Sequence, residues 1–137
     1  MAYQDEEQAR YERGKALMDE LSDGRAGDLM ESLKDVSPKL VREAAAWGFG
    51  EIYSRPQLGP RDRQLFTIGM LTALGDCGPQ LRLHIGMALN AGLTPVEIVE
   101  ALLQSAGYCG FPRAINATLL AKEVFAERNL LPVEGAE

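Results

Sequence analysis

The sequence is poor in histidine, cysteine and positive charge. It has one histidine, two cysteines and one tryptophan in 137 residues, and its 14 Lys and Arg are outnumbered by 20 Asp and Glu, for a net charge of −6. Binding to phosphate backbones needs a basic face, so we expect no nucleic-acid partner. Two cysteines are too few for a disulfide framework, and one histidine with scattered carboxylates does not give the ligand spacing of a zinc site. We therefore expect no disulfide scaffold and no metal.

Long apolar runs are also missing. No run approaches the roughly 20 residues that span a bilayer, so we expect no membrane partner. The first 20 residues are rich in charge and hold no signal-peptide core. Together with the low cysteine content, this predicts a protein of the reducing cytoplasm. The strict period-2 alternation of half-buried strands does not occur either, so no Gly-rich phosphate loop follows a strand.

The residues that are present predict an all-α fold in a single domain. The composition is 46% hydrophobic and 25% charged, as in ordinary globular proteins. Gly and Pro divide the chain into about six helices. We predict one domain over 1–137, with an N-terminal helical extension at 1–36, a core at 37–128 and a frayed tail at 129–137.

Helix start and stop signals define the core. Ser37-Pro38 and Thr94-Pro95-Val96-Glu97 are N-terminal caps with proline at the first helical position, and the second is a capping box. Gly75 is a suitable C-terminal cap, and residues 107–112 should break a helix. The spacing predicts an antiparallel hairpin at the centre of the fold, with arms at 60–75 and 79–91, packed with helices at 94–106 and 112–128.

The helix over 60–75 is apolar on most of its circumference. A helix of this kind is buried on nearly all sides, and a chain of this length has few elements with which to cover it. We therefore expect a homo-oligomer.

One stretch of the chain gathers reactive residue types around the lone histidine. Gln80 and His84 are four residues apart on one helix and share a face, and Cys77 lies two turns before His84. The start of a helix favours a thiolate, so Cys77 is a candidate reactive thiol. The simpler interpretations are a histidine with a satisfied hydrogen bond and a cysteine that serves as a small apolar residue.

The spacing Cys77-x2-Gln80-x3-His84 resembles the Cys-x2-Cys-x3-His redox motif of alkyl hydroperoxidase D-like proteins. Here Gln80 stands where that motif has its second cysteine. Without two thiols no local disulfide can form, so the redox chemistry of that branch is not supported.

A longer stretch resembles the carboxymuconolactone decarboxylase family, a sister branch of the same superfamily. The similarity covers roughly residues 37 to 125 and rests on the order and spacing of several segments, namely 47–48, 51–56, Leu58 with Arg63, 67–75, 81–84, 88–94, 97–98 with Glu100, and 106–117. Two departures fall near the presumed site: the stretch before Leu81 is one residue longer than usual, and Arg113 stands where the family often has a small residue.

The resemblance implies an alkyl hydroperoxidase D-like helical fold, a ring of three or six copies, and a cofactor-free lyase. The family reaction removes CO2 from a carboxylated unsaturated lactone such as 4-carboxymuconolactone. It needs groups that hold a carboxylate, donors for a growing oxyanion, and a proton donor with a pKa near neutrality. We assign catalysis to His84, Glu51 and Cys77. Substrate binding is assigned to Gln80, Arg63, Arg82, Tyr108, Arg113 and Trp47.

Several of these residues also have simpler interpretations. Arg82 can be a solvated surface charge, Trp47 and Tyr108 can belong to a core or an interface, and Glu51 can be an exposed helix charge. Two other functions remain open: a thiol-dependent peroxidase or reductase that uses Cys77, and a non-catalytic accessory protein. The small-molecule partner in the first case is an organic acid or lactone, and no cofactor is expected.

Overall fold

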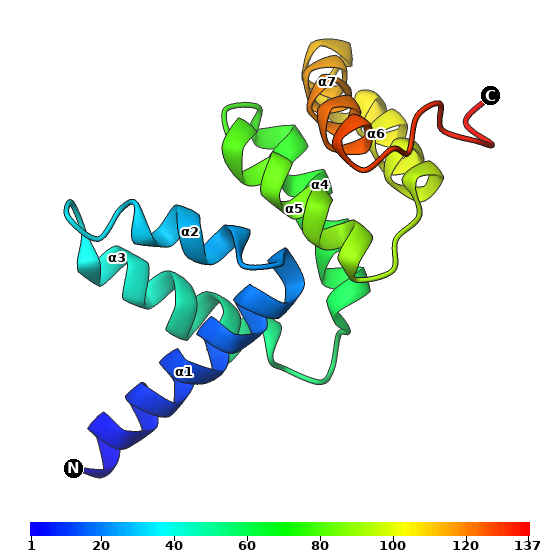
Figure 1. Cartoon of the computed structure of the whole chain (residues 1–137). Coiled ribbons are helices and arrows are strands. Elements are labelled where there is room, and N and C mark those ends of the chain that lie inside the picture. The colour runs from blue at the N-terminus through cyan, green and yellow to red at the C-terminus, as the bar shows by residue number, and fades with distance from the viewer. The chain divides into compact units, whose positions relative to one another are not determined.

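The computed structural model describes all 137 residues and confirms the all-α prediction. Its elements, in chain order, are α1 (Ala2–Ser22), α2 (Arg25–Glu31), α3 (Pro38–Glu43), the π-helix η1 (Ala44–Tyr53), α4 (Pro60–Leu74), α5 (Gly78–Asn90), α6 (Pro95–Cys109) and α7 (Phe111–Glu127) (Figure 1). They form two compact units, Met1–Gly59 and Pro60–Glu137. A search of the helices for one with the length and apolarity of a membrane span finds none.

In the first unit, α1 packs against η1 at very short range. A Cβ atom added to Gly14 would lie 1.9 Å from the carbonyl oxygen of Ala45, and one added to Gly50 would lie 2.0 Å from the carbonyl oxygen of Arg10. The two backbones are therefore in direct contact, which only glycine permits at these positions. Arg13 adds a hydrogen bond from its Nε to the Gly50 oxygen at 3.0 Å.

The helix that begins at Ser37 changes type along its length. The Ser37 side chain accepts a hydrogen bond from the Leu40 amide and Pro38 occupies the first turn, as the sequence predicts. The predicted end near Tyr53 is also confirmed. From Ala44 onward, however, the segment is a π-helix. Helix propensities do not distinguish these two helix types, so the change could not be predicted from the residues.

The second unit is built on the predicted hairpin. Its arms α4 and α5 pack together, α6 lies against α4, and α7 lies against both α5 and α6 (Figure 1). The core includes Ile68, Ile85, Ile98, Leu102 and Phe125, which are all exposed by 2% or less. One helical arm of the hairpin therefore presents one face to α5 and another to α6.

The predicted caps of this unit are present. The Thr94 hydroxyl accepts from the Glu97 amide at 3.3 Å, and the Glu97 carboxylate accepts from the Thr94 amide at 2.8 Å. Gly75 ends α4 with a φ of +83°. The predicted break at 107 came too early: Gly107 lies inside α6, and the helix ends at Gly110, whose φ of +88° favours glycine.

The prediction that α4 is buried on nearly all sides is wrong for the single chain. Phe66 is 64% exposed, Met70 43% and Leu74 60%, and these side chains form a stripe at a spacing of four residues. Neighbouring helices add further exposed apolar side chains, namely Leu103, Tyr108, Phe111, Ile115 and Leu119. An apolar surface of this extent is unusual for a monomeric protein.

Candidate active site

The lone histidine is held by a buried amide across the α4–α5 hairpin. His84 Nδ1 lies 2.8 Å from Gln64 Oε1, and Gln64 is completely buried. On its other side, the Gln64 amide nitrogen lies 3.7 Å from Met87 Sδ, which is also buried. His84 itself is partly buried on α5. The three residues form one polar contact chain in an otherwise apolar helix interface.

The contacts of Gln64 fix the orientation of its amide and the tautomer of His84. A thioether sulfur accepts hydrogen bonds and donates none, so the amide NH2 belongs on the Met87 side and the carbonyl oxygen on the His84 side. A carbonyl oxygen only accepts, so Nδ1 of His84 carries the hydrogen. In the neutral ring, Nε2 is then the nitrogen with the lone pair and the one that can take up a proton.

Burial changes the acid–base character expected for His84. Desolvation disfavours the charged imidazolium and lowers the pKa of His84 from 6.5 to about 4. The intrinsic pKa of histidine, which pointed to His84 in the sequence, is therefore lowered by its buried position. Near neutral pH the imidazole is uncharged and acts first as a proton acceptor.

Gln64 was not predicted from the sequence, although a signal existed. It shares the buried face of α4 with Ile68 and Thr72, at a spacing of four residues. Thr72 satisfies itself by donating to the Ile68 carbonyl oxygen at 2.8 Å. A glutamine has no such local partner, and the predicted antiparallel hairpin places residue 64 opposite the region of His84.

Cys77 is the N-cap residue of α5, as predicted, but its thiol is not activated. Desolvation and the Asp76 carboxylate, which accepts from Sγ at 3.6 Å, raise the pKa of the Cys77 thiol. This direction is opposite to the thiolate that the helix start suggested. Gln80, one turn before His84, is exposed.

Arg82 and Arg113 lie close to other elements of the second unit. Arg82 forms ion pairs with Glu123 at 2.6 Å and with Glu127, and so ties α5 to α7. Arg113 lies over Gly75, where an added Cβ would be 2.7 Å from its Nε. Its charge is therefore at the C-terminal end of α4, which favours a cation. A substrate carboxylate that bound either side chain would have to replace these contacts.

Arg63, Tyr108, Trp47 and Glu51 lie in different surroundings. Arg63 is half-buried and directly precedes Gln64 on α4, which makes it the predicted arginine nearest in sequence to the amide. Tyr108 is 88% exposed near the end of α6. Trp47 and Glu51 belong to η1 in the first unit, where Trp47 is 60% exposed. The roles assigned to these four residues stay predictions.

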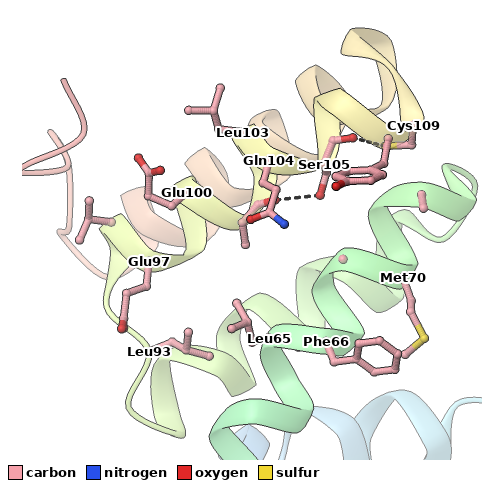
Figure 2. Close-up of a pocket in the computed structure, with 15 residues that line it drawn as sticks. Leu65, Phe66, Met70, Leu93, Glu97, Glu100, Leu103, Gln104, Ser105 and Cys109 are labelled. Carbon is pink, nitrogen blue, oxygen red and sulfur yellow. Dashed lines mark hydrogen bonds between the residues drawn. The ribbon is translucent and has the colours of Figure 1, made fainter.

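A groove of about 830 Å³ lies between α4 and α6. Leu65 from α4 and Gln104 from α6 point into it, and Phe66 and Met70 lie side by side on α4 (Figure 2). Tyr108 and Cys109, from the last turn of α6, also line the groove. His84 is not part of its lining. Successive residues of a helix are rotated by about 100° about its axis. The rotation from Gln64 is therefore about 140–200° for the groove residues Phe66, Gly69 and Ala73. The groove and the imidazole are thus on opposite sides of this helix.

Comparisons with known proteins match most of this chain. The family model described as "Carboxymuconolactone decarboxylase family" matches residues 38–123. The chain is 32% identical to a 4-carboxymuconolactone decarboxylase of Acinetobacter baylyi, over 92% of this chain and 94% of that protein. It is 33% identical to an uncharacterized 15.0 kDa protein of Paracoccus denitrificans, over 73% and 75%. It is also 36% identical to the nitrosuccinic acid decarboxylase of Metarhizium robertsii, over 56% and 53%.

The helical hairpin with its single histidine and the order of the matched segments define a small all-α protein of the alkyl hydroperoxidase D-like type. Within that class, the chain belongs to the carboxymuconolactone decarboxylase family.

Proposed function

We propose that this protein is a cofactor-free decarboxylase that acts on a small carboxylated unsaturated lactone or a related acid. The observation that carries the proposal is the contact of the His84 imidazole with the buried amide of Gln64, in a chain related along 92% of its length to a 4-carboxymuconolactone decarboxylase. The name of the Metarhizium robertsii relative also denotes decarboxylation of a small acid.

The reaction asks for one proton and no redox partner. When the bond to the carboxylate carbon breaks, its electron pair flows into the conjugated carbonyl, and CO2 leaves. A carbon of the resulting enolate then takes a proton. We assign the delivery of that proton to Nε2 of His84, which first receives it from solvent as the anionic substrate binds. A carboxylate beside the ring favours the charged imidazolium and so raises its pKa in the complex.

Arg63 is the residue that we propose for holding the substrate carboxylate. It is half-buried on α4 and adjoins Gln64 in the sequence. A guanidinium binds a carboxylate through two parallel hydrogen bonds, which would also orient the bond that breaks.

Release of CO2 from a panel of acids tests the proposed function. The panel contains 4-carboxymuconolactone, nitrosuccinate and saturated analogues that lack the conjugated carbonyl. We expect turnover of at least one unsaturated or nitro-activated acid and none of the saturated analogues, because only the former can accept the electron pair. Failure of the purified protein to release CO2 from any member would contradict the proposal.

The pH dependence should follow the low pKa of His84 in the free protein. With a pKa of about 4, the protonated fraction falls about tenfold for each pH unit above 5, and kcat/KM should fall with it if Nε2–H is the donor. The decline of kcat should begin at higher pH, because the bound carboxylate raises the pKa of the ring. Steady-state kinetics between about pH 5 and 8 measure both, and a flat kcat/KM would exclude protonated His84 as the donor.

Replacing Cys77 with Ser should change decarboxylation less than about threefold, since no step of the proposed reaction uses a thiol and the raised pKa keeps Cys77 protonated. Thiol titration and peroxide consumption serve as the matched measurements on both proteins. A Cys77→Ser variant that loses all activity, with peroxide turnover by the native protein, would favour the thiol-dependent peroxidase instead.

The exposed apolar surface supports the proposal that copies of the chain associate, as a trimer or a hexamer. The stripe of Phe66, Met70 and Leu74 is the part of α4 that the single chain leaves uncovered. Light scattering at micromolar concentration should therefore give a mass several times the 15.0 kDa of one chain. A Phe66→Ser, Met70→Ser double variant should shift the mass toward that of the monomer. A native protein that scatters as a monomer would contradict this expectation.

A further inference from the structure

Burial of the Gln64 side chain is unfavourable in free energy. Its side chain is completely buried between α4 and α5, and a buried amide is unfavourable unless its hydrogen-bonding groups find partners. It finds two, the imidazole of His84 and the sulfur of Met87. A leucine of similar size would fill the same space without this requirement. The amide therefore calls for an explanation other than packing.

We infer that Gln64 is a positioning residue for the proposed decarboxylation: its amide oxygen holds His84 in the tautomer with hydrogen on Nδ1, which makes Nε2 the atom that exchanges a proton with the substrate. The part of this inference that concerns catalysis rests on the proposed function. The part that concerns the tautomer rests on the contacts of Gln64 alone.

The missing charge of Gln64 matters as much as its hydrogen bond. A carboxylate in contact with Nδ1 would stabilise the imidazolium and hold it charged before any substrate arrives. The amide accepts the same hydrogen bond but adds no charge, so burial dominates and the ring stays neutral. The imidazole then becomes charged only when the substrate brings its own carboxylate, and proton uptake is coupled to substrate binding.

The charged side chains near α5 have partners on that helix other than His84. From α7, Glu123 and Glu127 pair with Arg82, and Arg128 donates to the carbonyl oxygen of Gly86 at 3.2 Å. On α4, Arg63 is the charged residue beside Gln64 in the sequence, and a cation there would oppose the imidazolium and so act in the same direction as burial.

The chain has one histidine, so its ring can be observed alone. In protein labelled with 15N at histidine, the two ring nitrogens give separate signals that distinguish protonated from unprotonated nitrogen. At pH 7 we expect native His84 to show hydrogen on Nδ1 and a lone pair on Nε2. The same spectra, followed to low pH, should give a pKa of about 4. A native protein with hydrogen on Nε2 would overturn the inference without any variant.

Two substitutions separate the hydrogen bond from the charge. Gln64→Leu keeps a similar volume but removes the acceptor, and should return both tautomers to the spectrum. Gln64→Glu keeps the acceptor and adds charge, and should raise the pKa of His84 by about 1–3. Thr72→Val is the matched control, because Thr72 is equally buried on the same face of α4 but bonds only to its own helix. It should leave the histidine signals unchanged.

Kinetics then test the catalytic half of the inference. Gln64→Leu should lower kcat about 10–100-fold with little change in KM. Loss of a group that orients a metal-bound histidine lowers activity on the same scale. Gln64→Glu should move the decline of kcat/KM to higher pH. A Gln64→Leu variant that melts like the native protein and retains both its tautomer and its kcat would overturn the inference. If the spectra are as expected but no CO2 is released, the proposed function is contradicted. The assignment of Gln64 as the residue that fixes the tautomer would still hold.

Discussion

Replacing His84 with Asn is expected to lower kcat for decarboxylation by about 10²–10⁴-fold, the usual contribution of a positioned acid–base group. The amide nitrogen of asparagine can take the place of Nδ1 and donate to Gln64 Oε1, so the contact across the hairpin is kept while Nε2 is lost. The melting temperature should therefore stay close to that of the native protein. Steady-state assays of CO2 release, with thermal melts of both proteins, measure the two quantities together.

The matched variant is His84→Ala, which should lose the same activity and also lose stability. Alanine leaves the buried oxygen of Gln64 without its donor, at a cost of about 1–3 kcal/mol. A histidine that only lined a pocket would contribute little to stability, but His84 also satisfies the buried amide of Gln64. Decarboxylase activity retained in His84→Asn would eliminate His84 as the proton donor.

Replacing Gly14 with Ala should destabilise the first unit by several kcal/mol, beyond the roughly 1–3 kcal/mol typical of overpacking. The new methyl group would lie 1.9 Å from a carbonyl oxygen and 2.6 Å from the Gly50 amide nitrogen, and both obstacles are backbone that cannot rotate away. The helices α1 and η1 would have to separate. Chemical denaturation followed by far-UV circular dichroism should show an earlier loss of helix.

Gly48→Ala is the control for this effect. Gly48 lies in the same π-helix, has no positive φ, and an added Cβ there would meet nothing within 4 Å. Alanine should be neutral or slightly stabilising at this position, because it restricts the unfolded chain. If the two variants melt alike, the close approach of α1 to η1 is not present in solution.

The sequence predicted the helices more completely than the site. The caps at Ser37 and Thr94 and the end at Gly75 depend on residues within a few positions of each other, so local chemistry was enough to find them. The π-helix and the contact of Gly14 with Gly50 depend on residues more than 30 positions apart, and no local pattern reports them.

The candidate site divides in the same way. His84 was identified because it is the one histidine, and Cys77 because of its spacing from it. The direction of both pKa changes depends on burial and on contacts, which spacing does not contain. Gln64 was missed because glutamine is usually a surface residue, and only the pairing of α4 with α5 shows where its amide is directed.

The two-sided character of α4 restricts how this chain can change in length over time. Inserting or deleting one residue between Gln64 and Ile68 would turn Gln64 by about 100° relative to the part of α4 that leads into α5, and so move its amide away from His84. Single-residue gaps should therefore be purged within α4 and accumulate in the connection around Asp76, where the chain is not helical. The stretch before Leu81, which is longer than the family resemblance leads one to expect, lies in and beside that connection. A change in the number of residues there does not rotate Gln64 away from His84.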